Sequence, residues 1–160
     1  MKWQVVRASY VAAVLKIIDL IETGIFVLRK KNNQITTLHI YHHVTTVLVA
    51  VISSRYISTG MAVFVPILNC SVHVIMYTYY FLSNLDGPIK QMVLPLKRWI
   101  TIIQMVQFII LAIHVSISLL PSCPVPRLPG CLVLPNIFLN FALFYNFYKK
   151  AYLSPRKNEN

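Results

Sequence analysis

Long apolar segments, separated by short polar and basic clusters, make up most of the chain. Four of these segments, each of 21 to 30 residues, contain no Asp, Glu, Lys or Arg. The hydrocarbon core of a bilayer is about 30 Å thick, and about 20 helical residues cross it. A fifth apolar segment, at the N-terminus, carries internal charges. The pattern predicts five membrane-spanning helices, at about 3–28, 36–54, 62–82, 99–120 and 131–150, followed by a tail at 151–160.

The continuity of the apolar segments favours helices over strands. A membrane-spanning strand alternates apolar and polar residues over about ten positions, and these segments do not alternate. Hydrophobic residues make up 57% of the chain and charged residues 12%, whereas a soluble domain has roughly 45–50% apolar and about 25% charged residues. The apolar fraction also excludes a disordered chain, and a count of only three cysteines excludes a disulfide scaffold. We therefore predict an all-α, multi-pass membrane helix bundle.

Basic residues outnumber acidic ones by 15 to 4, which gives a net charge of +11. They lie at the ends of the apolar segments, so they do not form the single basic face of a nucleic-acid-binding domain. Five spans divide the loops into two sets, and ten basic residues fall in the set that includes the C-terminal tail, against four in the other. Because cytosolic loops of membrane proteins are enriched in Lys and Arg, the C-terminus is predicted to be cytosolic.

Three histidines at the start of the second predicted span, His39, His42 and His43, are the strongest chemical signal. On a helix they fit within an arc of about 100°, so they can converge on one site. Imidazole serves as a metal ligand, a general base or a nucleophile. The alternative is a polar helix face at the membrane interface, without chemistry.

The third predicted span carries a polar stripe formed by Asn69, His73, Met76, Tyr77 and Tyr80. Helical spacing places all five within about 100° of one another. Strongly polar groups at membrane depth are costly unless they line a cavity or find partners. The stripe therefore favours a site over a simple packing face.

The first predicted span contains Lys16, Asp19, Glu22 and Thr23 among apolar residues. Lys16, Asp19 and Thr23 fall within about 60° of one another on a helix. A Lys–Asp pair three residues apart lowers the cost of burying both charges, so a purely structural salt bridge is an equal alternative to a functional role. Polar residues also repeat at helical spacing on the fourth span, where hydrogen bonding between helices explains them nearly as well as function does.

Taken in their order along the chain, these motifs resemble those of the ELO family of very-long-chain fatty-acid elongases. The resemblance covers nearly the whole chain, as one domain over 1–160. Two departures matter: Asp19 and Glu22 exchange the acid types of the family motif, and family members have seven membrane helices, of which the chain corresponds to the last five. The residues that match the family motifs are Lys16, Asp19, Glu22 and Thr23; Leu28 to Asn32; His39, His42 and His43; Asn69, His73, Met76, Tyr77, Tyr79 and Tyr80; Thr101, Gln104, Gln107 and Phe108; and Phe144, Tyr145, Phe147, Tyr148 and Tyr152.

The resemblance implies an acyltransferase of the endoplasmic reticulum membrane that condenses acyl-CoA with malonyl-CoA to 3-ketoacyl-CoA and releases CO2 and CoA. It implies no tightly bound cofactor and no metal; its partners would be the two substrates, the bilayer, and other elongases or the reductase and dehydratase enzymes of the cycle. His42 would take the acyl group as an acyl-imidazole, assisted by His39, His43 and His73. The residues expected to bind substrate are Lys16, Asp19, Glu22, Arg29, Lys30, Lys31, Asn69, Met76, Tyr77, Tyr80, Gln104 and Gln107.

Two other functions remain open on the residues alone. Membrane di-iron desaturases and hydroxylases also contain an H-x-x-H-H box, but they use about eight histidines, and this chain has five. Iron bound at stoichiometry would favour that class. The second alternative is an inactive helical bundle that associates with full-length elongases, because the chain corresponds to only five of the family's seven helices. The basic cluster at Arg29 to Lys31 fits CoA phosphates, but the positive-inside rule alone also explains it.

Overall fold

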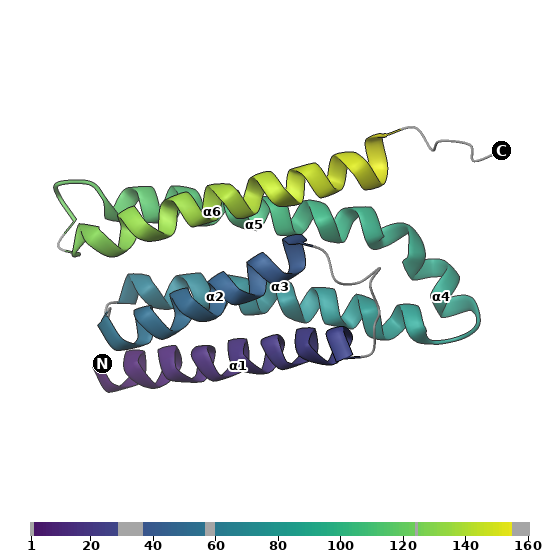
Figure 1. Ribbon diagram of the computed structural model, residues 1–160, viewed down its shortest axis with the longest axis horizontal. Coiled ribbons are helices and arrows are strands. Elements are labelled where there is room, and N and C mark those ends of the chain that lie inside the picture. The colour runs from purple at the N-terminus through teal and green to yellow at the C-terminus, as the bar shows by residue number, and fades with distance from the viewer. Residues whose placement is uncertain (1, 29–36, 57–59, 124, 155–160) are drawn as a thin grey trace.

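The computed structural model describes residues 2–28, 37–56, 60–123 and 125–154, and this part of the chain is helical with no strands. The predicted all-α helix bundle is confirmed (Figure 1). Short helical turns, α4 (Pro88–Val93), the 3-10 turn η1 (Leu94–Leu96) and the π-turn η2 (Lys149–Leu153), extend two of the long helices. The long helices are α1 (Lys2–Leu28), α2 (Thr37–Tyr56), α3 (Gly60–Asn84), α5 (Lys97–Ser118) and α6 (Arg127–Tyr148).

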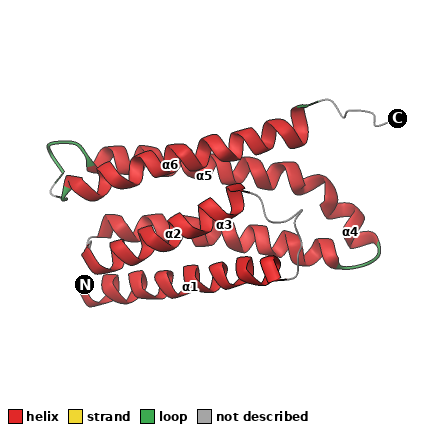
Figure 2. Cartoon of the chain, viewed as in Figure 1, coloured by secondary structure: helices red, strands yellow, loops and turns green. Residues whose placement is uncertain are grey.

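The long helices run up and down beside one another, and the N- and C-termini lie at opposite ends of the bundle (Figure 1). Helix α1 packs mainly on α2, and α5 packs mainly on α6. Helix α3 joins the two pairs through α5 and α1, and α2 also contacts α6. Helices α2 and α3 thus lie between α1 and the α5–α6 pair. Among the described residues, a short turn links α3 to α4 (Figure 2).

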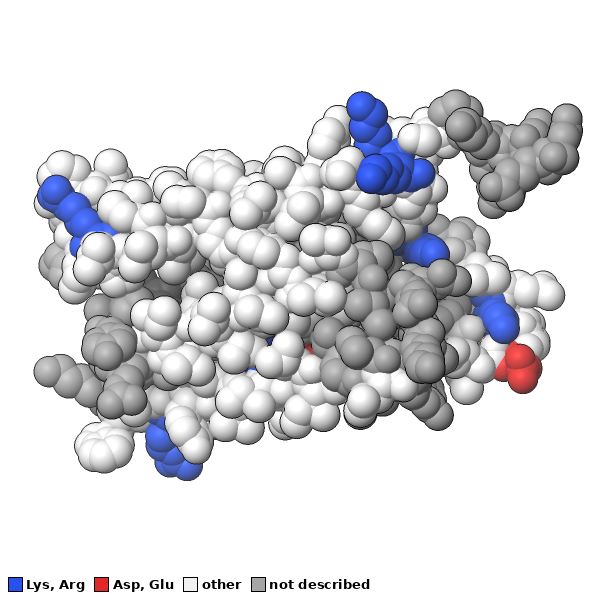
Figure 3. All heavy atoms as spheres, viewed as in Figure 1, with Lys and Arg blue, Asp and Glu red and all other residues white. Residues whose placement is uncertain are grey.

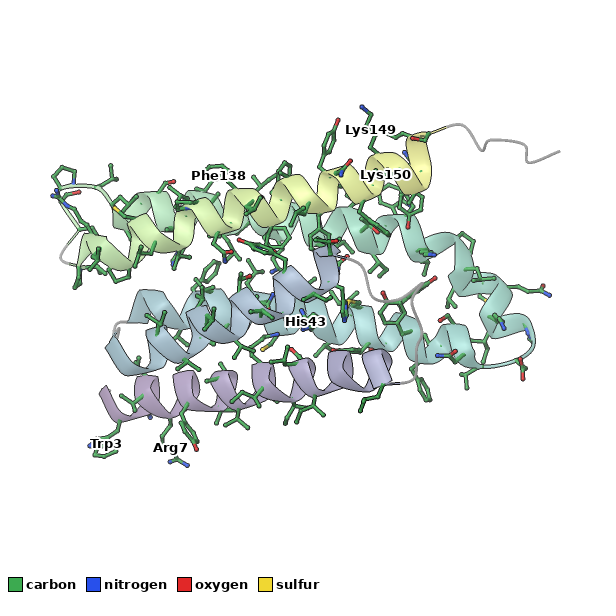
Figure 4. The ribbon with its side chains drawn as sticks, in the orientation of Figure 1. Trp3, Arg7, His43, Phe138, Lys149 and Lys150 are labelled. Atoms are coloured by element: carbon green, nitrogen blue, oxygen red, sulfur yellow. The ribbon has the colours of Figure 1, made fainter. Side chains whose placement is uncertain are left out.

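Three stretches within the described residues are long and apolar enough to cross a membrane: Val63–Asn84, Pro88–Ser118 and Arg127–Leu153. The apolar stretch of α2, Thr37–Ile52, is shorter. Large apolar side chains cover the outside of the bundle; Phe138, for example, is 57% exposed and points outward from α6 (Figure 4). A surface of this kind suits lipid rather than water. Together with the family reported below, it makes the chain a multi-pass membrane protein.

The core lies mainly between α5 and α6. Phe108, Leu111 and Val115 on α5 pack with Ile137 and Phe144 on α6, and all five are buried. The rings of Phe108 and Phe144 lie 5.2 Å apart between their centroids. Because these residues recur at steps of three, four or seven positions, they form one buried stripe on each helix. This close packing fixes the wall against which the candidate site is built.

One glycine sets how closely α5 and α6 approach at the end where they meet. A Cβ on Gly130 would lie 2.6 Å from Cδ2 of Leu119 and 3.2 Å from Oγ of Ser118. Glycine therefore allows the start of α6 to pack directly against the end of α5. At the opposite end, Gly87 adopts a φ of 94°, which favours glycine, in the turn before α4.

Charged side chains gather at the two ends of the bundle and leave most of the visible surface between them uncharged (Figure 3). Arg7 and Arg127 belong to one end, whereas Lys149 and Lys150 belong to the other (Figure 4). The up-and-down order of the helices also places Lys97, at the start of α5, at the C-terminal end. The described members of the larger predicted basic set therefore share one end of the molecule.

Candidate active site

Four histidines from two helices come together inside the bundle. On α2, the ring centroids of His39 and His43 lie 4.4 Å apart, and those of His42 and His43 lie 5.5 Å apart. His73 on α3 faces them, with its ring 6.1 Å from that of His42 and 6.2 Å from that of His43. His42, His43 and His73 are buried, and Figure 4 shows His43 in the interior. Helical spacing thus brings the histidines of the box to one place, and α3 supplies the fourth ring.

His42 packs against aromatic rings and an amide from α5 and α6. The rings of Phe108 and Phe144 meet it edge to face, at centroid distances of 5.9 and 5.8 Å. On its remaining side, Nδ1 of His42 lies 3.2 Å from Oδ1 of Asn140, the most buried residue described, at 2% exposure. The ring is therefore held by two aromatic neighbours and one amide.

Asn140 is part of a hydrogen-bonded network between α2 and α6. Its Nδ2 donates to the main-chain oxygen of Asn136 at 2.9 Å and lies 3.2 Å from Oδ1 of the same residue. Tyr41 on α2 donates its hydroxyl hydrogen to Oδ1 of Asn136 at 2.9 Å. Tyr41, Asn136 and Asn140 are not among the site residues predicted from the sequence. The available signal was two amides one helical turn apart in an uncharged span, where polar groups require partners.

A buried ion pair lies beside the histidines. Nζ of Lys16 donates to Oδ2 of Asp19 at 2.7 Å, and the Lys16 side chain is only 6% exposed. The hydroxyl of Tyr77 donates to Oδ1 of Asp19 at 3.3 Å. Nδ1 of His73 lies 3.6 Å from Oδ2 of the same carboxylate. The local Lys–Asp pair considered from the sequence is therefore present, and it joins α1 to the polar stripe of α3.

A cavity extends from this polar cluster along α5 and α6. It has a volume of about 140 Å³ and opens in part to the surroundings. Oδ1 of Asn69 is buried and has no hydrogen-bond partner among the described residues. The polar end of the cavity is lined by Lys16, His42, Asn69, Gln107 and Asn140. This end can receive the polar head of a ligand.

Beyond the polar end, the cavity wall is mostly apolar. Leu111 and Val115 on α5, together with Val133 and Ile137 on α6, line this stretch. His114 is the imidazole on this stretch of the wall, and its ring stacks against Phe64 at 4.4 Å. The cavity reaches the turn between α5 and α6, where Gly130 allows the two helices to pack closely. Its form, polar at one end and apolar along its length, matches an amphipathic ligand.

Other residues selected from the sequence lie apart from this cluster or outside the described part. Gln104 donates to Sδ of Met76 at 3.3 Å and does not line the cavity. Tyr80 is 49% exposed, and its ring packs against that of Tyr79. The structure does not describe the side chains of Glu22 and Thr23, or the residues Arg29, Lys30 and Lys31.

Cys70, Cys123 and Cys131 are not joined in disulfides in the described part of the chain. Within the described residues, no group of three His, Cys, Asp or Glu side chains is arranged to hold a metal ion.

Comparison with known proteins identifies the family. The model of the GNS1/SUR4 family (ELO) matches residues 1–160. Very long chain fatty acid elongase 4 of Homo sapiens is 38% identical over 144 residues, which are 90% of this chain and 46% of the relative. Elongase F of Drosophila melanogaster is 40% identical over 146 residues, covering 89% of this chain and 56% of the relative. Elongase 1 of Mus musculus is 36% identical over 157 residues, covering 96% and 56%.

The chain thus spans about half the length of the curated relatives it matches. No solved structure matches it significantly. The family match extends over every helix described above, including the histidines of α2 and the cavity wall of α5 and α6. The chain belongs to the ELO, or GNS1/SUR4, family.

Proposed function

We propose that the chain forms the catalytic centre of a very-long-chain fatty-acid elongase that condenses acyl-CoA with malonyl-CoA. One observation supports this function above the others: His42 lies where the polar end of the cavity meets its apolar wall. A thioester bound there, with its tail along the wall, has its carbonyl carbon beside an imidazole. The names of the relatives support the same activity.

In the first half of the reaction, His42 acts as the nucleophile. Its free ring nitrogen attacks the thioester carbonyl, an acyl–nitrogen bond forms, and the carbon–sulfur bond breaks. CoA leaves as the thiol once it has taken up the proton that the imidazole loses. The edges of Phe108 and Phe144 exclude water from the ring, which protects the acyl-imidazole from hydrolysis.

In the second half, malonyl-CoA loses CO2 and leaves an enolate that attacks the acyl-imidazole. A carbon–carbon bond forms, the acyl–nitrogen bond breaks, and 3-ketoacyl-CoA is released. Lys16 lies at the polar end of the cavity, where a cation stabilises the malonyl carboxylate and then the enolate oxygen. The ring of His73 lies beside that of His42 and assists by hydrogen bonding to the substrate. His39 and His43 pack against each other and support the rings of His42 and His73. The reaction requires no bound cofactor.

The apolar part of the cavity holds the acyl tail. Along α5 it extends from Phe108 to Ser118, a rise of ten residue steps, or about 15 Å at about 1.5 Å per residue. An extended acyl chain advances about 1.3 Å per carbon, given a C–C bond of about 1.5 Å. The cavity therefore accommodates about a dozen carbons. Since lipid is as apolar as the wall, the fit of the tail selects the substrate more than its hydrophobicity does.

We further propose that the protein resides in the endoplasmic reticulum membrane and that the basic end of its bundle faces the cytosol. Lys97, Arg98, Lys149 and Lys150 mark this end, and α2 carries its histidines into the bundle from the same side. Cytosolic loops are enriched in basic residues, and the phosphates of two CoA substrates are attracted to such a surface. Other elongases and the enzymes of the remaining elongation steps are the proteins expected to act beside it.

The test of this function is acyl transfer to His42. The purified chain in lipid nanodiscs, given acyl-CoA alone, is expected to release CoA and to gain the mass of the acyl group on the peptide that contains His42. His42→Ala removes both signals. His114→Ala is the matched control, because His114 lines the same cavity farther along its wall, and it retains most of the CoA release. An adduct that persists in His42→Ala, or equal loss in both variants, contradicts the mechanism.

A further inference from the structure

We propose that Asn140 is a positioning residue: it fixes the tautomer of His42 so that Nδ1 carries the ring proton and Nε2 presents its lone pair to the substrate. The role of this tautomer in acyl transfer rests on the proposed function, whereas the tautomer itself rests on the hydrogen-bond network alone. Neither residue of the α6 pair, Asn136 or Asn140, belongs to the histidine box or to the polar stripe of α3.

The contacts of Asn140 on α6 fix the orientation of its side-chain amide. Its Nδ2 lies 2.9 Å from the main-chain oxygen of Asn136, and a carbonyl oxygen can only accept a hydrogen bond. With the amide reversed, two acceptor oxygens would face each other at that distance. The second contact of Nδ2, to Oδ1 of Asn136, agrees, because Tyr41 donates to the same oxygen and marks it as an acceptor. Oδ1 of Asn140 must therefore point toward His42.

The orientation of the Asn140 amide determines which ring nitrogen of His42 carries hydrogen. Oδ1 of Asn140 accepts and does not donate, so the contact of 3.2 Å with Nδ1 of His42 is a hydrogen bond only if Nδ1 carries hydrogen. A neutral imidazole has one such hydrogen, so Nε2 is left as a lone pair. Both residues are buried, at 2% exposure for Asn140 and 8% for His42, so bulk water is a poor substitute for either partner.

The His42 ring cannot readily flip and so exchange the positions of its two nitrogens. Phe108 and Phe144 meet it edge to face from two directions, and a flipped ring would turn a carbon toward Oδ1 of Asn140. The buried amide would then lose its partner. His42 lines the cavity, and Nδ1 is already engaged. Nε2 is thus the nitrogen available to an acyl group, and acylation needs no prior proton transfer from it.

The experiment reads the tautomer directly, by NMR of the ¹⁵N-histidine-labelled chain in nanodiscs. The His42 signals are identified by their absence in His42→Ala. We expect wild type to show hydrogen on Nδ1 and none on Nε2, and Asn140→Leu to lose this preference. Asn146→Leu is the matched control, because Asn146 is exposed on the same helix, and it leaves the His42 signals unchanged. Hydrogen on Nε2 in wild type, or an unchanged His42 spectrum in Asn140→Leu, overturns the proposal.

A second variant separates positioning from folding. In Asn140→Asp a carboxyl oxygen still accepts from Nδ1, so the tautomer is expected to persist even where the variant is less stable. In a catalytic triad the wrong histidine tautomer costs up to about 10⁴ in rate, and a neutral amide partner is weaker, so the acyl-transfer rate at saturating acyl-CoA should fall by about 10–100-fold in Asn140→Leu. The half-saturating acyl-CoA concentration should stay unchanged, and Asn140→Asp should recover most of the rate.

Equal loss of acyl-transfer rate in Asn140→Asp and Asn140→Leu, with the folded fraction matched, would contradict positioning through the acceptor oxygen. The outcomes distinguish a failure of acyl transfer to His42 from a failure of the tautomer assignment. A wild-type chain that shows hydrogen on Nδ1 but forms no adduct contradicts acyl transfer to His42 and leaves the tautomer assignment intact. A chain that forms the adduct while hydrogen sits on Nε2 contradicts the assignment and leaves acyl transfer intact.

Discussion

Substituting Val133 by tryptophan should shorten the longest acyl chain that the cavity accepts. Along α6 the cavity extends from Asn140 to Gly130, a rise of ten residue steps, or about 15 Å. Val133 lies on this wall three residues before Gly130, where α6 packs against the end of α5, and an indole there fills the space beyond it. The lost length is about 4.5 Å. At about 1.3 Å per carbon, derived from a C–C bond of about 1.5 Å, this corresponds to three or four carbons.

The measurement is the rate of CoA release from a series of acyl-CoA substrates that differ by two carbons. In Val133→Trp the rate should be lost for the longest members and kept for the shortest, because a close-packed wall does not open to admit the excess carbons. Overpacking itself costs about 1–3 kcal/mol of stability, so the folded fraction is measured in parallel. Leu132→Trp is the control, since Leu132 is 63% exposed and does not line the cavity. A length limit that stays unchanged in Val133→Trp, or that moves equally in both variants, would refute the tail placement.

Three further outcomes are expected. Asp19→Asn leaves Lys16 buried without its counter-charge and should destabilise the fold by about 3–5 kcal/mol, whereas the double variant Lys16→Met/Asp19→Leu should lose less stability. SDS-driven unfolding measures both, and a double variant less stable than Asp19→Asn contradicts the pairing. Phe144→Ala opens a void between α5 and α6 and should cost about 3–5 kcal/mol in the same assay, while Tyr145→Ala, at a half-exposed site, should cost far less; equal losses would contradict a core position for Phe144. A glycosylation acceptor fused after Asn160 should stay unmodified in microsomes, and its modification would reverse the proposed orientation.

The helix bundle could be predicted from the sequence because uncharged length is a direct measure of membrane crossing. The ends of the helices were harder to place. Helix α5 begins at Lys97, two residues before the predicted start, because basic side chains at a membrane surface can extend toward water from the first helical turn. Helix α6 begins at Arg127, four residues early, because Pro129 and Gly130 are tolerated in a first turn. The short helix Pro88–Val93 was not predicted, since its few residues carry no membrane-spanning pattern.

The grouping of the histidines could also be expected, because helical spacing alone puts His39, His42 and His43 on one face of α2. Spacing does not choose between two similar residues on one helix. Gln104 and Gln107 both carry amides on α5, three positions apart, and the sequence treated them alike. The structure turns Gln107 into the cavity and Gln104 toward Met76, because a rotation of about 60° separates their directions and different helices lie on those two sides.

The α6 amides illustrate the same limit from the opposite direction. Asn136 and Asn140 follow one another by a single helical turn in an uncharged span, a pattern that ordinary hydrogen bonding between membrane helices explains. What gives Asn140 a chemical role is its partner, and His42 lies 98 positions away along the chain. Only the contact between α2 and α6 brings the two together. Because a buried amide at membrane depth must find a partner, such residues in uncharged spans merit the same attention as histidines, and their partners then decide whether they hold helices together or hold a reactive ring in place.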